Sequence, residues 1–218
     1  MIKSNIVIVD YQLGNLFSVN QALNSIGLEC KISSNPLDIS QADALILPGV
    51  GAFKDAMQNL KTLGLDIEIK NFIKSNKPFL GICLGLQLLF TSSEEFGYSE
   101  GLNILKGKVI RFPNINISGS LIKVPQISWN SIHISNSLVW NNSPLSIVNE
   151  GDDMYFVHSY YVVPEENEVI VSKTSYAGID YVSSIQKNNI FACQFHPEKS
   201  GVKGIEIYKK WAQINNLI

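Results

Sequence analysis

The sequence has few cysteines and few histidines, and their spacing excludes two common kinds of site. Of its 218 residues only three are cysteines (Cys30, Cys83 and Cys193), and these lie far apart without any CxxC pair. They therefore predict neither a disulfide framework nor a zinc site. The three histidines also lack the paired spacing of metal ligands, so we expect no metal and no cofactor.

Long hydrophobic runs and blocks of like charge are scarce as well. The N-terminal apolar run, residues 6–9, is too short for a signal-peptide core or a membrane span, so we expect a cytoplasmic protein. The 17 basic and 19 acidic residues give a net charge of −2, which offers no attraction to nucleic acid or to an anionic membrane. With 45% hydrophobic residues, the composition is that of a globular protein, and we expect a single domain over residues 1–218.

The first half of the chain alternates short apolar runs with amphipathic segments, which is typical of a parallel sheet with connecting helices. From about residue 103, β-prone runs follow one another closely and predict antiparallel hairpins added to this sheet. We therefore expect an α/β fold with a mostly parallel central sheet. The predicted strands are 5–10, 29–34, 43–49, 79–83, 104–111, 121–132, 154–163, 168–175, 181–186 and 190–195; the predicted helices are 16–26, 53–63, 65–75, 84–90 and a final one around 205–212.

One stretch, KPFLGICLGLQLLF at residues 77–90, places a cysteine between two glycines inside an apolar run. A predicted strand leads into Cys83 and a predicted helix leaves it, so G-x-C-x-G is the cysteine counterpart of the G-x-S-x-G nucleophile elbow. Gly81 and Gly85 would relieve crowding in that turn. The positive end of the helix dipole favours a reactive thiolate, and the N–H of Leu84 can face a developing oxyanion. Cys83 is the predicted nucleophile; we interpret the other two cysteines as core residues.

A base for this nucleophile is predicted in IFACQFHPEKSG, residues 190–201. A strand delivers His196 to its end, where Pro197 stops the strand. Glu198, two residues later, can accept a hydrogen bond from the imidazole and fix its tautomer, as in a nucleophile–base–acid triad. Strand alternation places Gln194 on the face of His196 and Cys193 on the opposite face.

The third piece is LPGVGAF, residues 47–53, where a predicted strand ends in a glycine-rich loop. Its glycines allow the backbone to approach a ligand closely or to turn an N–H inward. Val50 or Gly51 could thereby supply a second oxyanion donor. Taken alone, the same loop would be interpreted as an ordinary strand-to-helix turn.

The motifs PGVG, GICLGLQ and FHPEKS, in this order, resemble those of the class I (triad-type) glutamine amidotransferases. DYQLGNL (10–16), KVPQISWN (123–130) and YFVHSYY (155–161) are similar to blocks in the glutaminase subunit of imidazole glycerol phosphate synthase. The similarity extends from about residue 5 to the final helix. Other class I members usually carry a histidine where Leu86 stands. The resemblance implies a flavodoxin-like three-layer fold.

The resemblance also implies a reaction, the hydrolysis of L-glutamine to glutamate and ammonia. Cys83 would form a glutamyl thioester, His196 would move protons and Glu198 would orient His196. The oxyanion would be stabilised by N–H groups of Leu84 and of the Val50–Gly51 region. The substrate-binding residues implied in this way are Gly49, Gly51, Gln87, Glu94, Ser159 and Tyr160.

The same resemblance implies a partner protein: a cyclase subunit with a (β/α)8-barrel fold, which would form a heterodimer with this chain. Ammonia would pass to this cyclase, which makes imidazole glycerol phosphate and AICAR in histidine biosynthesis. The glutaminase would be nearly idle until the partner binds its nucleotide substrate, with the PGVG loop as the switch. The residues expected at the partner interface or tunnel are Asn15, Trp129, Asn130 and Tyr155.

The middle block departs from the family pattern and leaves alternatives open. The family commonly has His-Met/Ile-Gly-Trp-Asn, whereas this chain has Gln126, Ile127 and Ser128 before the retained Trp-Asn pair. A paralogous amidotransferase subunit that supplies ammonia for amidated sugars of surface polysaccharides is the main alternative to histidine biosynthesis. A stand-alone thiol hydrolase or a non-catalytic regulatory subunit remain as further alternatives.

Overall fold

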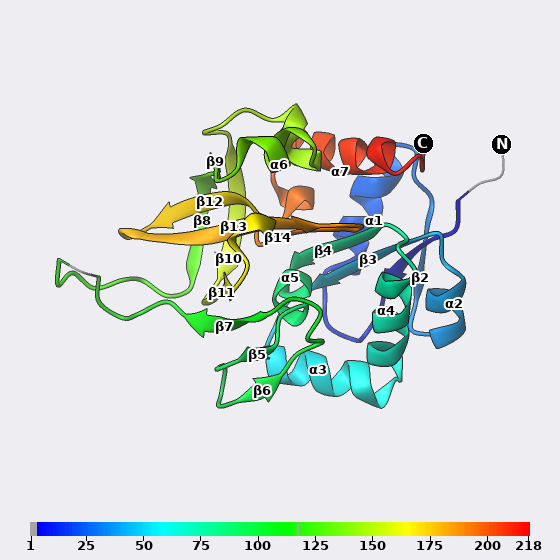
Figure 1. Cartoon of the computed structure of the whole chain (residues 1–218), viewed down its shortest axis with the longest axis horizontal. Coiled ribbons are helices and arrows are strands. Elements are labelled where there is room, and N and C mark those ends of the chain that lie inside the picture. Colours follow the sequence, from blue (N-terminus) through cyan, green and yellow to red (C-terminus); the bar gives the residue numbers. More distant parts are fainter. Residues whose placement is uncertain (1–3, 117) are drawn as a thin grey trace.

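The computed structural model describes residues 4–116 and 118–218, and a large mixed sheet forms its centre (Figure 1). Within these residues, eight strands pair in the order β2-β1-β3-β4-β14-β13-β12-β9. The five strands from β2 to β14 pair in parallel, and β13, β12 and β9 continue the sheet antiparallel. The strands are β1 (Ile6–Val9), β2 (Cys30–Ser33), β3 (Ala44–Gly49), β4 (Phe79–Cys83), β9 (His133–Ile134), β12 (Ile170–Tyr176), β13 (Ile179–Lys187) and β14 (Ile190–Cys193).

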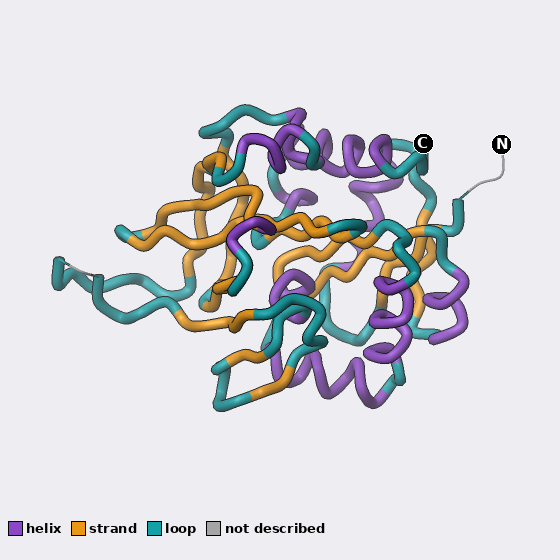
Figure 2. The backbone as a smooth tube through the Cα atoms, in the orientation of Figure 1, coloured by secondary structure: helices purple, strands orange, loops and turns teal. Residues whose placement is uncertain are grey.

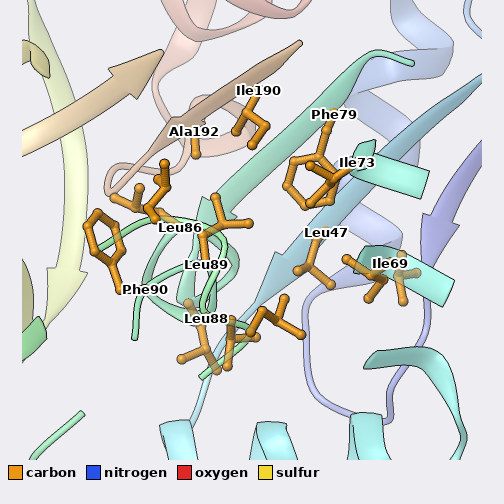
Figure 3. Packing of buried hydrophobic residues seen from close by; sticks show 14 of the residues in the cluster. Leu47, Ile69, Ile73, Phe79, Leu86, Leu88, Leu89, Phe90, Ile190 and Ala192 are labelled. Atoms are coloured by element: carbon orange, nitrogen blue, oxygen red, sulfur yellow. The ribbon is translucent and has the colours of Figure 1, made fainter. Parts of the chain in front are cut away.

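Helices cover both faces of this sheet, as the backbone trace in Figure 2 shows. α1 (Leu16–Ser25), α6 (Ser137–Asn141) and α7 (Gly201–Ile214) contribute to the apolar cluster on one face. α2 (Pro36–Gln41), α3 (Phe53–Thr62), α4 (Leu65–Lys74) and α5 (Leu84–Leu88) contribute to the cluster on the other (Figure 3). The predicted three-layer α/β fold with its mostly parallel sheet is confirmed.

The two apolar clusters follow from strand alternation. In β1, Val7 and Val9 join the α3–α5 side, whereas Ile6 and Ile8 join the α1–α7 side. β4 and β14 divide in the same way, and Cys193 lies opposite Ala192 as predicted. All four residues of β1 are buried, because a parallel strand covered by helices on both faces requires a continuous apolar run.

Two smaller sheets lie beside the carboxyl ends of the parallel strands (Figure 1). β8 (Gln126–Ser131) pairs with β10 (Asp153–His158), and β11 (Tyr160–Pro164) joins β7 (Gly107–Arg111), β5 (Ser92–Ser93) and β6 (Ser99–Glu100). The predicted strand 154–163 is thus two strands in different sheets, separated at Ser159. The described part of the chain also contains three short 3-10 helices: η1 (Pro144–Ile147), η2 (Asn167–Val169) and η3 (Pro197–Lys199).

Most predicted helices are confirmed to within two residues, and Asn15 caps α1 by accepting a hydrogen bond from the N–H of Ser18. Two short helices, α2 and α6, were not predicted from the sequence, and each contains little more than one turn. Among the described residues, no helix is long and apolar enough to cross a membrane.

The short helix α5 packs directly on the backbone of β3. Gly85 lies in the first turn of α5, and a Cβ on this residue would overlap the carbonyl oxygen of Leu47. Gly81 in β4 is also confined, since a Cβ there would lie 2.9 Å from the Cβ of Ala192. The two glycines that flank Cys83 are therefore required by close packing of a helix on its own sheet.

This contact predicts the outcome of Gly85→Ala. Alanine favours an isolated helix over glycine, yet the added methyl group collides with backbone that cannot move aside. We expect the free energy of unfolding to fall by about 3 kcal/mol, as for overpacked cores, measured by urea denaturation. Gly27→Ala is the control, because its Cβ meets nothing within 4 Å and only its positive φ costs about 1 kcal/mol. Equal losses in the two variants would contradict the packing argument.

Candidate active site

Cys83 is the last residue of β4 and has the strained backbone of a nucleophile elbow. Its φ is 54° and its ψ is −106°, a combination that residues with a side chain rarely adopt. The next residue, Leu84, opens α5. Cys83 is 5% exposed and lines a cavity at this end of the sheet. The chain therefore turns sharply enough to aim Cys83 out of the core and into the cavity.

His196 and Glu198 form a buried hydrogen-bonded pair just after β14. The imidazole Nδ1 lies 2.8 Å from Oε1 of Glu198, and both side chains are almost fully buried. The hydroxyl of Tyr208 on α7 donates to the other carboxylate oxygen at 3.1 Å. Ser200 Oγ donates to the carbonyl oxygen of His196 at 2.7 Å. The carboxylate is thereby satisfied on both oxygens and fixes the orientation of the imidazole.

The His196 imidazole has an unusual protonation equilibrium. Burial alone lowers its pKa, but the charge and hydrogen bonding of Cys83, together with the hydrogen bond and charge of Glu198, outweigh burial and raise the pKa from 6.5 to about 10. Cys83 and Glu198 together therefore favour the imidazolium form of His196.

A cavity of about 250 Å³ opens beside Cys83. It is large enough for a small polar molecule and is only partly enclosed. Six predicted site residues besides Cys83 line it, as do four residues that were not predicted. The lining consists of Val50, Gly51, Cys83, Leu84, Gln87, Glu95, Pro125, Val157, His158, Ser159 and Tyr160.

The structure does not place Glu94 in this cavity. Its side chain is 62% exposed and lies 3.9 Å from Nζ of Lys108, whereas the neighbouring Glu95 lines the cavity. Oε2 of Glu95 accepts a hydrogen bond from the N–H of Phe53 at 2.6 Å, and burial is the main cause of the raised pKa of this carboxyl group. The turn after β5 thus presents the second glutamate to the site, which spacing along the sequence cannot resolve.

Gly49 is likewise not part of the cavity wall. It ends β3 in the core, where a Cβ would overlap the hydroxyl of Tyr11. That hydroxyl is buried without a hydrogen-bond partner in the described residues, and its pKa is raised by burial and by the charge of Cys83. Gly49 therefore makes room for Tyr11 beneath the PGVG loop, while Val50 and Gly51 lie at the cavity.

Two buried polar side chains near Cys83, those of Gln194 and His158, were not singled out as site residues in the sequence. Nε2 of Gln194 donates to Sγ of Cys83 at 3.5 Å, and its Oε1 accepts from Gln87 at 3.0 Å. Nδ1 of His158 lies 2.9 Å from the carbonyl oxygen of Tyr160. Burial is the main reason that the pKa of His158 is lowered to about 4. His158 is therefore neutral beside the cationic His196.

The residues predicted to face a partner divide into two groups. Trp129 on β8 is 53% exposed and stands opposite Tyr155 on β10, with ring centroids 6.1 Å apart. The carbonyl oxygen of Tyr155 accepts a hydrogen bond from the N–H of His196 at 3.0 Å. Asn130 donates instead to the carbonyl oxygen of Ser175, and Asn15 caps α1. No group of three potential metal ligands occurs within residues 4–116 and 118–218.

A family model confirms the class that this site defines. The model of the class-I glutamine amidotransferases matches residues 7–212. Solved structures agree on the fold: PurLQS from Thermotoga maritima superposes with a TM-score of 0.70 at 20% identity, over 97% of this chain and 99% of that one. A glutamine amidotransferase from the same organism superposes with a TM-score of 0.61 at 17% identity, over 98% of this chain and 85% of that one.

Relatives of known function show to which family within this class the chain belongs. The imidazole glycerol phosphate synthase subunit HisH of Aquifex aeolicus is 48% identical over 94% of this chain and 94% of its own length. HisH of Syntrophotalea carbinolica is 44% identical over 96% of this chain and its whole length. The chain belongs to the class-I glutamine amidotransferases and, within that class, to the HisH family. The resemblance stated from the motifs is confirmed.

The charge coupling predicts how the two buried histidines titrate. We expect ¹⁵N NMR of the imidazoles to show His196 cationic and His158 neutral throughout pH 5 to 9. Because the pKa of His196 is raised on folding, its contribution to stability is complete below pH 6.5 and is lost as pH rises to about 10. Glu198→Gln keeps an acceptor but removes the charge, and should lower the midpoint of His196. Titration of wild-type His196 near pH 6.5 would refute the coupling.

Proposed function

We propose that this chain is the glutaminase subunit of an imidazole glycerol phosphate synthase, with Cys83, His196 and Glu198 as its catalytic residues. The observation that carries the proposal is the strained Cys83 elbow at a cavity, coupled to the buried His196–Glu198 pair. The similarity to HisH proteins over nearly the whole chain supports the choice of synthase over the sugar-amidating alternative.

In the proposed reaction Cys83 acts as a thiolate nucleophile beside the His196 imidazolium. Cys83 attacks the carboxamide carbon of glutamine and forms a tetrahedral oxyanion, which backbone N–H groups of Leu84 and of Val50 or Gly51 stabilise. The His196 imidazolium gives its proton to the departing nitrogen, and ammonia leaves a glutamyl thioester. Neutral His196 then takes a proton from water, which attacks the thioester; the thiol leaves and glutamate is released.

The glutamine molecule is proposed to bind in this cavity. Gln87, Glu95 and the Ser159–Tyr160 segment between β10 and β11 all line it. Glu95 takes the place that the sequence analysis gave to Glu94, and its carboxylate is suited to the α-ammonium group of the substrate. Gly51, with a φ of 103°, allows the loop backbone to approach the carboxamide.

Ammonia is proposed to pass to a (β/α)8-barrel cyclase in a cytoplasmic heterodimer. The exposed Trp129 and its neighbour Tyr155 are the proposed contact, because a large exposed aromatic side chain is typical of interface hot spots. The carbonyl oxygen of Tyr155 accepts a hydrogen bond from the N–H of His196. A partner that contacts Tyr155 would therefore touch a residue that is hydrogen-bonded to the catalytic base.

A glutaminase assay with and without the cyclase tests the proposal. We expect glutamate formation to be slow for the chain alone and to rise when the cyclase and its nucleotide substrate are added. Cys83→Ala should abolish turnover, at least 10⁴-fold, because no other group can form the thioester. Cys30→Ala is the matched control, since Cys30 lies on β2 away from the cavity. Full turnover without any partner would refute the assignment as a synthase subunit.

A second prediction concerns the interface. Truncation of Trp129 removes a large apolar surface, so Trp129→Ala should weaken cyclase binding by about tenfold or more, measured by calorimetry. Leu138→Ala is the matched control, because Leu138 is 72% exposed on α6 and is not among the proposed interface residues. If both variants bind alike, Trp129 is not part of the interface.

A further inference from the structure

Gln194 is a buried amide in contact with the sulfur atom of Cys83. It follows β14, is 0% exposed, and its Nε2 lies 3.5 Å from Sγ. Its Oε1 lies 3.0 Å from Nε2 of Gln87, which in turn lies 3.0 Å from the carbonyl oxygen of Tyr160. A chain of hydrogen bonds therefore runs from the cavity wall to the nucleophile.

We propose that Gln194 is a further catalytic residue, whose side-chain amide donates a hydrogen bond to the Cys83 thiolate and fixes the orientation of the Gln87 side chain. This inference rests on the proposed role of Cys83 as the nucleophile and adds the group that stabilises its reactive form.

The direction of each hydrogen bond follows from one unambiguous acceptor. The carbonyl oxygen of Tyr160 can only accept, so the group of Gln87 that faces it is the amide nitrogen. The same nitrogen also faces Gln194, which must therefore present its oxygen. The amide nitrogen of Gln194 is then the group left to face Cys83.

Two effects follow from this arrangement. A hydrogen bond from a buried amide favours the thiolate over the thiol, because the bond to a charged acceptor is the stronger one. Gln87 donates both of its amide protons, one to Tyr160 and one to Gln194. Its side-chain oxygen therefore remains available as an acceptor at the cavity. Gln194 therefore acts on the attacking atom and on one wall of the substrate site.

Alkylation by iodoacetamide tests the first effect without glutamine turnover. The Cys83 thiolate displaces iodide and forms a thioether, which mass spectrometry counts on the Cys83 peptide across pH 5 to 10. The full chain is used, alone and with its cyclase. Gln194→Met removes the donor, and Gln194→Glu replaces it with a carboxylate while keeping an acceptor for Gln87. Gln186→Met and Gln186→Glu on β13 are matched controls, since Gln186 does not line the cavity.

We expect both Gln194 variants to alkylate Cys83 about tenfold more slowly at pH 7 and to shift the rate profile to higher pH, while the Gln186 variants match the wild type. A purely structural role would lower the melting temperature without moving the profile. If both Gln194 variants alkylate at the wild-type rate with the wild-type pH profile, the role proposed for Gln194 is overturned, while the role of Cys83 as the nucleophile stands. A wild-type Cys83 that reacts no faster than Cys30 would instead overturn Cys83 as the nucleophile, and this inference with it.

Discussion

The site depends on the close approach of α5 to the backbone of β3. Gly85 rests against the carbonyl of Leu47, and this contact holds α5 so near the sheet that the chain must reverse direction within one residue. Cys83 takes up that reversal in a backbone conformation that would be costly elsewhere. Apolar burial in the surrounding core offsets this conformational free energy, since Leu84 and Leu86 of α5 are buried with Leu47. Apolar packing on the α3–α5 side thus fixes the position of a thiol on the edge of the cavity.

The other half of the site depends on buried charge. A lone imidazolium at the depth of His196 would lose its proton, because burial disfavours the charged form. Glu198 and the charge of Cys83 reverse this preference, and Tyr208 on α7 satisfies the remaining carboxylate oxygen. The final helix therefore does more than cover the sheet, since it completes the hydrogen bonding of the acid in the proposed triad. His158 nearby stays neutral, because burial and the charge of His196 lower its pKa more than its hydrogen bond to Tyr160 raises it.

The parts predicted from the sequence are those that local pattern determines. The buried parallel strands, the elbow at Cys83 and the His196–Glu198 spacing each depend on a few adjacent residues. Glu95 escaped detection because two glutamates stand side by side, and only the turn after β5 decides which one faces the cavity. Gln194 was placed on the face of His196 but given no role, because its contact with Cys83 joins residues 111 positions apart. Pairing of β14 with β4 creates that contact.

The departure at residues 126–128 acts at two different places. Gln126 points inward and accepts from the hydroxyl of Tyr181, which lies 3.4 Å from Nε2 of His158, so this position belongs to the buried network behind the cavity. A histidine there, as in the family pattern, would add a second imidazole ring to this network, whereas the amide of Gln126 adds no titratable group. Ile127 alternates outward and is 57% exposed beside Trp129. Within this block, the exposed Ile127 is therefore the departure that a partner could contact, while the loss of the histidine concerns the interior of the site.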